Sequence, residues 1–116
     1  MTKVLAIIPA RMGSSRFPGK PLKKINGIPM IQRVYENVIK SNIINETLIA
    51  TCDKEIFNFC KQINANVIMT SIKHTRASDR CAEALEKYQK KTKKKYAVVC
   101  MVQGDEPLIN SQMIKE

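Results

Sequence analysis

The stretch from Val4 to Pro21 reads VLAIIPARMGSSRFPGKP. Its first five residues, Val4 to Ile8, form an unbroken apolar run, which is typical of a strand buried on both faces of a sheet. The residues that follow are rich in glycine, serine and basic side chains. The pattern therefore predicts a buried strand that runs directly into a polar loop.

This loop has the composition of an anion-binding segment. Its two glycines and two serines let the backbone turn tightly and present N–H groups to an anion. Arg11, Arg16 and Lys20 add three positive charges within ten residues. The glycine spacing fits neither a Walker loop nor a GxGxxG fingerprint. We interpret the loop as a polyphosphate cradle, with a mobile basic loop as the alternative.

The rest of the chain alternates between strand and helix patterns. Further apolar runs predict strands over 48–52, 67–69 and 96–102. Helical spacing predicts a helix that begins at Pro29, with Ile39 on its inward face and a stop at Asn42. Further helices are predicted to begin at the cap residues Asp53, Ser78 and Ser111, and Asn64 is predicted to end the helix after Asp53 in a left-handed conformation. Right-handed crossovers then give an α/β, Rossmann-like, mostly parallel sheet with helices on both faces, in one domain.

Ligands of such sheets bind outside the carboxyl ends of the strands, which directs attention to the loops there. Gln103-Gly104-Asp105-Glu106-Pro107 follows the fourth predicted strand. A carboxylate at Asp105 is well placed to hold Mg²⁺ against phosphates, and a plain turn is the alternative. Together with the basic loop it favours a metal–nucleotide site. Arg80, at the start of a helix, is expected to contact phosphate or base.

The formal net charge of +10 raises the possibility of a nucleic-acid partner. Six of the 20 basic residues, however, lie between Lys87 and Lys95, and no aromatic residue is found inside that run except Tyr88. Single-strand binders place stacking aromatics within a basic groove. The run is therefore interpreted as a solvated helix end and loop.

Other classes are disfavoured by what the sequence lacks. No apolar run approaches the ~20 residues that cross a bilayer. The four cysteines contain no CxxC pair, and His74 is the only histidine. A structural zinc site is not expected, and reduced thiols indicate a cytoplasmic protein.

Three blocks of the chain resemble sugar nucleotidyltransferases that activate acidic sugars with CTP. They are residues 8–31, 69–83 and 102–107, and their order and content are most similar to the 3-deoxy-manno-octulosonate (Kdo) cytidylyltransferase family. The resemblance implies the nucleotide-diphospho-sugar transferase fold. It also implies an enzyme that transfers CMP from CTP to the anomeric hydroxyl of a 2-keto acid sugar, Kdo or a relative, releasing pyrophosphate for lipopolysaccharide or surface polysaccharide synthesis.

The same resemblance assigns roles to individual residues. Nucleotide binding falls to Ala10, Arg11, Ser14, Lys20, Arg80 and Gln103. Catalysis falls to Arg11, Lys20 and Asp105, and Asp105 is also the magnesium ligand. Arg16 meets either phosphate or the sugar carboxylate, and the sequence does not choose between them.

Two departures from the family pattern qualify this assignment. Arg76-Ala77 stands where the family commonly has a small serine and glycine pair, so Ala77 is expected to alter the local backbone. Family members are also considerably longer. Residues 1–116 are expected to be the amino-terminal nucleotide-binding part, without the carboxy-terminal part for sugar binding and for homodimer formation. A catalytically incomplete fragment that binds CTP and Mg²⁺ is the alternative, and a small basic nucleic-acid-binding domain is a less favoured one.

Overall fold

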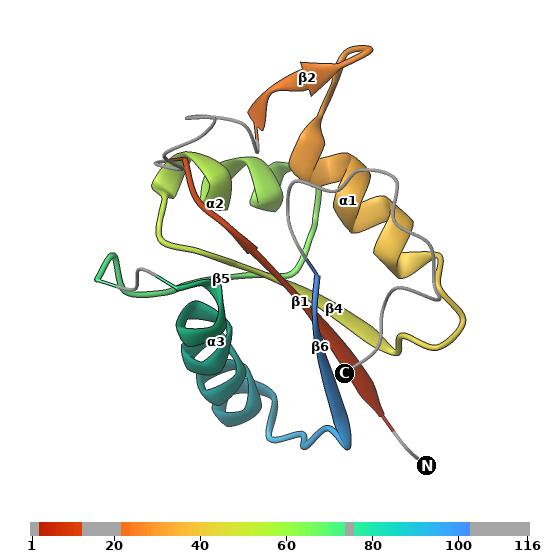
Figure 1. Ribbon diagram of the computed structural model, residues 1–116, viewed down its shortest axis with the longest axis vertical. Coiled ribbons are helices and arrows are strands. Elements are labelled where there is room, and N and C mark those ends of the chain that lie inside the picture. The colour runs from red at the N-terminus through yellow and green to blue at the C-terminus, as the bar shows by residue number, and fades with distance from the viewer. Residues whose placement is uncertain (1–2, 13–21, 74–75, 103–116) are drawn as a thin grey trace.

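Each apolar run of the sequence becomes a strand of one parallel sheet (Figure 1). The computed structural model describes residues 3–12, 22–73 and 76–102. The strands of this sheet are β1 (Val4–Ala10), β4 (Glu46–Thr51), β5 (Val67–Met69) and β6 (Val98–Met101). The helices are α1 (Met30–Ile39), α2 (Lys54–Gln62) and α3 (Ala77–Thr92). The predicted α/β class with helices on both faces is confirmed.

Within the described ranges the strand order is β5-β4-β1-β6, and every pairing is parallel. β1 pairs with β4 up to Ala10 and Thr51, and with β6 up to Ile7 and Met101. The chain therefore builds outward from β1 on one side, through β4 and β5, and then returns to add β6 on the other side. β1 is the strand at which the direction of winding reverses.

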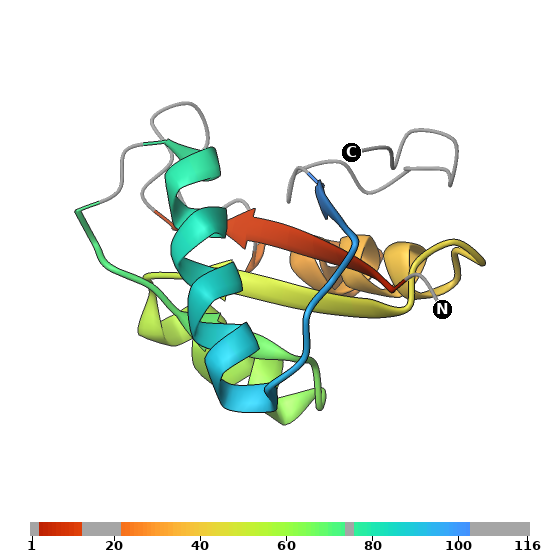
Figure 2. The same ribbon diagram turned by 90° about the horizontal axis from the view of Figure 1, so that it is seen from below.

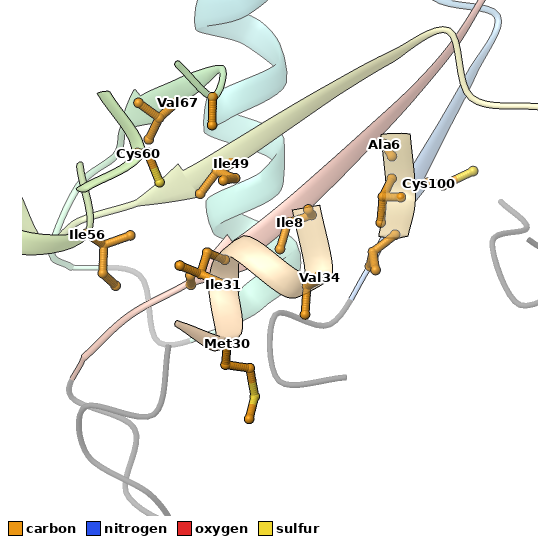
Figure 3. Packing of buried hydrophobic residues seen from close by; sticks show 14 residues of the cluster. Ala6, Ile8, Met30, Ile31, Val34, Ile49, Ile56, Cys60, Val67 and Cys100 are labelled. Carbon is orange, nitrogen blue, oxygen red and sulfur yellow. The ribbon is translucent and has the colours of Figure 1, made fainter. Parts of the chain in front are cut away.

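The side chains of β1 alternate between two apolar clusters on opposite faces of the sheet. Ala6 and Ile8 lie in the cluster formed with α1 and α2, which Figure 3 shows from close by. Leu5 and Ile7 lie in the cluster formed with α3. Figure 2 shows α3 on one side of the strands. Because all four side chains are fully buried, the unbroken apolar run is explained by burial on both faces.

Helix α1 differs from its prediction at both ends. Pro29 ends the short strand β3 and immediately precedes the helix, instead of occupying its first position. Ser41 N–H bonds to the Val38 carbonyl at 3.0 Å, and this tight turn ends the helix before Asn42. Ile39 is 52% exposed, so its predicted place on the inward face was wrong. The last helical residue projects past the edge of the buried face.

A β-hairpin precedes α1 where the sequence predicts only a polar stretch. β2 (Lys24–Ile25) and β3 (Ile28–Pro29) pair antiparallel around Asn26 and Gly27. These two residues have φ values of 55° and 83°, the left-handed pair that a two-residue hairpin turn requires. An Asn-Gly pair between two short segments was the signal for this turn.

The starts of α2 and α3 do not use side-chain caps. Asp53 stands at the capping position of α2, but its side chain makes no capping bond. Ser78, predicted to cap the next helix, is already inside α3, which begins at Ala77 after Arg76. The predicted left-handed residue after α2 is confirmed, since Asn64 has φ 59°.

The lysine run occupies the end of α3 and the loop that follows, as predicted. Lys93 ends the helix in a left-handed conformation, with φ 58°. Three members of the run have structural partners: Lys87 donates to the Met69 carbonyl at 3.0 Å, Lys90 lies 3.4 Å from Glu86, and Lys94 lies 2.9 Å from Glu46. All six lysines of the run are exposed. All four cysteines are free thiols. None of the described helices has the length and apolar character needed to cross a bilayer.

Candidate functional site

The candidate site lies at the carboxyl ends of the strands, on either side of β1. Val102 N–H bonds to the Ile7 carbonyl at 2.9 Å, so the chain leaves β6 alongside β1. Since β4 and β6 are reached by crossovers in opposite directions, the end of β1 is a topological switch point, where α/β sheets bind ligands. The basic loop starts at this edge of the sheet, and Val102, the residue before the Gln-Gly-Asp-Glu-Pro segment in the sequence, lies alongside β1 there.

Residues Ala10 to Met12 form the described beginning of the basic loop. Ala10 ends β1 and is 6% exposed, and Arg11 after it is half-buried. Met12 packs against the cluster that α1 and α2 cover. Ser14, Arg16 and Lys20, which are predicted to act together with Arg11, lie outside the described residues. The structure thus places the first of the predicted phosphate-binding cations at the switch point.

Asp53 has a different role from the helix cap that the sequence predicts. Its Oδ2 accepts a hydrogen bond from Met12 N–H at 2.7 Å, and this long-range bond replaces the expected helix cap. Its own N–H donates to Thr51 Oγ1 at 3.1 Å. The carboxylate therefore belongs to the edge of the sheet and ties the exit of β4 to the exit of β1.

Arg80 reaches the same edge from the opposite face of the sheet. It lies in the first turn of α3 and is only 3% exposed. Its Nη2 donates to Cys52 Sγ, 3.7 Å away, at the end of β4. A buried guanidinium needs polar partners to offset its desolvation. The structure thus brings Arg80 and the Ala10–Arg11 segment together at neighbouring strand ends, as the sequence predicts, while their ligand roles stay predictions.

Further contacts hold α3 against β5 beside the site. Ser71 N–H donates to Glu83 Oε1 at 2.9 Å, and Glu83 lies 2.8 Å from Lys87 Nζ. Thr70 N–H bonds to the Thr51 carbonyl at 2.8 Å and continues the pairing of β4 and β5. These contacts fix the first turns of α3, and with them Arg80, at the edge of the sheet.

The Arg76-Ala77 departure from the family pattern has a simple structural outcome. Ala77 is the first residue of α3, where the backbone is right-handed and glycine is not required. Arg76 is exposed, and its Nε lies 3.8 Å from Asp79 Oδ2. The expected change relative to the family backbone at Ala77 stays a prediction. Asp79 lies in the first turn of α3, where a negative charge favours the helix start.

Three polar residues at this edge were not predicted from the sequence to be site residues. Cys52 and Asp53 directly follow the second strand, and the rule that ligands bind at carboxyl ends could have selected them. Glu83 carries no such signal, because its partner lies 12 residues away along the chain. Gln103 and Asp105 lie outside the described residues. The described ranges hold no cluster of three histidine, cysteine or carboxylate side chains that could bind a metal ion.

The parallel sheet, its switch point and its helices on both faces define a Rossmann-like α/β protein of the nucleotidyltransferase type. A family model described as cytidylyltransferase matches residues 5–116. The chain belongs to this cytidylyltransferase family.

Curated relatives share this assignment. The chain is 45% identical over 115 residues to a 3-deoxy-manno-octulosonate cytidylyltransferase of Parabacteroides distasonis, covering 99% of this chain and 43% of that protein. It is 47% identical over 113 residues to the mitochondrial enzyme of that name from Arabidopsis thaliana, covering 97% of this chain and 38% of that protein. The chain thus spans about two fifths of the length of these relatives.

Solved structures agree. CMP:2-keto-3-deoxy-manno-octonic acid synthetase, solved in complex with CTP, superposes with a TM-score of 0.85 at 37% identity, covering 96% of this chain and 44% of that one. A 4-diphosphocytidyl-2C-methyl-D-erythritol synthase superposes with a TM-score of 0.74 at 10% identity, which shows the shared fold alone.

Proposed function

We propose that this chain is the CTP-binding part of an enzyme that transfers CMP to a 2-keto acid sugar. The observation that supports this most strongly is the TM-score of 0.85 with a CMP:2-keto-3-deoxy-manno-octonic acid synthetase solved with CTP. Arg11 at the end of β1 and Arg80 beside the end of β4 supply positive charge at the same edge of the sheet. In the reaction, the anomeric hydroxyl oxygen of the sugar bonds to the α-phosphorus of CTP. The bond from that phosphorus to the pyrophosphate oxygen breaks, and the hydroxyl proton is lost.

The proposed residue roles follow from charge and position. Displacement at a phosphoryl group depends mainly on positioning and on neutralising charge. Arg11 and Lys20 bind the triphosphate, with Ala10, Ser14 and the loop N–H groups beside them. Arg80 and Gln103 orient the cytidine. Arg16 contacts either phosphate or the sugar carboxylate.

Magnesium is part of the proposal. Asp105 follows Val102 by three residues, and Val102 is buried alongside β1 at the switch point. Magnesium prefers one or two carboxylates together with phosphate oxygens, so the carboxylate of Asp105 suits a nucleotide-bound ion. Asp105 would hold the ion, and the bound ion would neutralise phosphate charge.

The test is a thermal-shift titration of this chain with CTP, UTP, GTP and ATP in Mg²⁺ buffer. A ligand that binds only the folded state raises the melting temperature by mass action. We expect a rise that is selective for CTP and that falls when EDTA removes the metal. An equal response to all four nucleotides, or none, would overturn the proposal.

Two lysine variants give a matched control. Lys20→Gln removes a charge assigned to the triphosphate, and Lys40→Gln removes one from an exposed residue directly after α1. We expect the CTP-induced shift to shrink in the first variant and to stay unchanged in the second. An equal decrease of the CTP-induced shift in both variants would mean that CTP binding depends only on the net charge of the chain.

The alternative is that this chain binds CTP and Mg²⁺ without turnover, and the length of the relatives favours it. An assay of pyrophosphate release with Kdo present separates the two, because only the complete reaction releases pyrophosphate. The homodimer and the role in lipopolysaccharide synthesis stay predictions from the resemblance, and the cytoplasmic location stays a prediction from the reduced cysteines.

A further inference from the structure

Asp53 extends the pairing of two strands beyond the point where their backbones separate. β1 and β4 are in register up to Ala10 and Thr51, so Met12 and Asp53 stand two positions further along each chain. There the backbone of β4 turns into α2 and no longer pairs with β1. The Asp53 carboxylate accepts the Met12 N–H at 2.7 Å in place of a backbone carbonyl.

The same carboxylate is linked to Arg80 through the thiol of Cys52. Cys52 donates its thiol hydrogen to Asp53 Oδ2 over 3.8 Å, and its sulfur accepts from Arg80 Nη2 at 3.7 Å. One connected set of side chains therefore runs from α3, across the end of β4, to the backbone at the start of the basic loop.

We propose that Asp53 is a positioning residue of the nucleotide site and acts through the Met12 N–H. It fixes the direction in which the chain leaves β1 directly after Arg11. The inference rests on the proposed function, because it assigns to Asp53 the placement of the triphosphate-binding segment. Asp53 itself does not contact the nucleotide.

A positioning role and a purely electrostatic role of Asp53 predict opposite effects on CTP binding when its carboxylate is removed. CTP is a polyanion, so a carboxylate near its site repels it, and removing that carboxylate should strengthen binding. A positioning role predicts the opposite. Without the acceptor, the Met12 N–H loses a charge-assisted hydrogen bond, and the start of the loop is no longer held in place.

Four variants separate the possibilities. Asp53→Ala removes the acceptor, whereas Asp53→Asn keeps an oxygen of the same reach without the charge. Asp53→Ser shortens the side chain by one bond but offers α2 a capping hydroxyl, which guards against failure to fold. Glu55→Gln removes an exposed carboxylate from the first turn of the same helix and serves as the matched control.

The experiment measures the CTP dissociation constant by calorimetry and the exchange rate of the Met12 amide hydrogen by NMR. For Asp53→Ala and Asp53→Ser we expect binding weaker by on the order of tenfold and faster Met12 exchange. For Asp53→Asn and Glu55→Gln we expect both values to stay near those of the wild-type chain.

Each contrary result has its own meaning. Met12 protection that survives in Asp53→Ala would overturn the inference, and so would unchanged or tighter CTP binding in that variant. Failure of the wild-type chain to bind CTP would overturn the proposed function, and with it any role of Asp53 in positioning a nucleotide. These failures are distinguishable because Met12 exchange is measured without a nucleotide.

Discussion

The hydroxyl of Tyr96 donates to the carboxylate of Glu46, at the edge of the sheet opposite the candidate site. Lys94 lies 2.9 Å from the same carboxylate, and the Tyr96 ring stacks on Tyr88 with centroids 6.2 Å apart. These contacts join the connection between α3 and β6 to the first residue of β4. Burial alone would raise the pKa of Glu46, but the hydrogen bonds from Tyr96 and Lys94 and the charges of Lys94 and Lys3 lower it overall.

Tyr96→Phe is expected to lower the free energy of unfolding by about 1 kcal/mol at pH 7, since it removes a bond to a partly exposed carboxylate and keeps the ring. The folded-state pKa of Glu46 is lowered, so this contribution is complete above the ordinary value of 4.5 and is lost as the pH falls through the folded-state pKa. Urea unfolding of both proteins at several pH values should show the difference shrinking in acid. A difference independent of pH would contradict the role of the Glu46 charge.

At the residue scale, the sequence predicted the role of a residue correctly when that role depends on its neighbours along the chain, and not when its bonding partner is distant in the sequence. Asn64 adopts its predicted left-handed conformation because that preference is local. The sequence suggests a helix cap for Asp53, and its partner Met12 is 41 residues away. Local patterns do not encode a bond that forms only when two strands pair. For the same reason the sequence could place Arg80 at the correct edge but could not identify Cys52 as its contact.

At the scale of elements, α1 shows which part of an amphipathic pattern contributes stability. Ile31 and Ile39 are the same residue type in the same helix, but Ile31 is fully buried and Ile39 is 52% exposed. Ile31→Ala is expected to lower the free energy of unfolding by about 3 kcal/mol, since it removes buried methyl groups and leaves a cavity. Ile39→Ala should change it by less than about 0.5 kcal/mol. Urea denaturation of both variants is the measurement, and similar losses would show that Ile39 packs inward in solution.

The strands were more predictable than the segments between them. A strand buried on both faces requires a continuous apolar run, and β1, β4, β5 and β6 all form on such runs. The hairpin of β2 and β3 was missed because each strand has only two residues, too few to show alternation. The starts of α1 and α3 differ from their predictions by one or two residues. α2 begins directly after Asp53 as predicted, but the Asp53 carboxylate bonds to Met12 N–H instead of capping the helix.

At the scale of the whole molecule, the candidate site and the lysines from Lys90 onward lie at opposite ends of α3. The helix has 16 residues, which corresponds to a length of about 24 Å at ~1.5 Å per residue. Arg80 lies in its first turn, at the carboxyl edge of the sheet, and Lys90 and Lys91 lie in its last. At physiological salt the Debye length is about 8 Å, so charges at the far end are strongly screened from a nucleotide.

The last prediction concerns the exposed lysines Lys90, Lys91, Lys93 and Lys95, changed together to glutamine. Lys87 and Lys94 are kept because their contacts with Glu83 and Glu46 support the fold. The variant carries four positive charges fewer than the formal +10. We expect its CTP dissociation constant to stay within about twofold of the wild-type value at physiological salt, because the lost charges are distant and screened.

Calorimetry with CTP checks this prediction, with Arg11→Gln as a comparison variant that should bind CTP more weakly. A tenfold loss in the lysine variant would place the run within reach of the nucleotide. Tight binding of a single-stranded oligonucleotide that depends on the four lysines and weakens steeply with salt would instead support the nucleic-acid alternative.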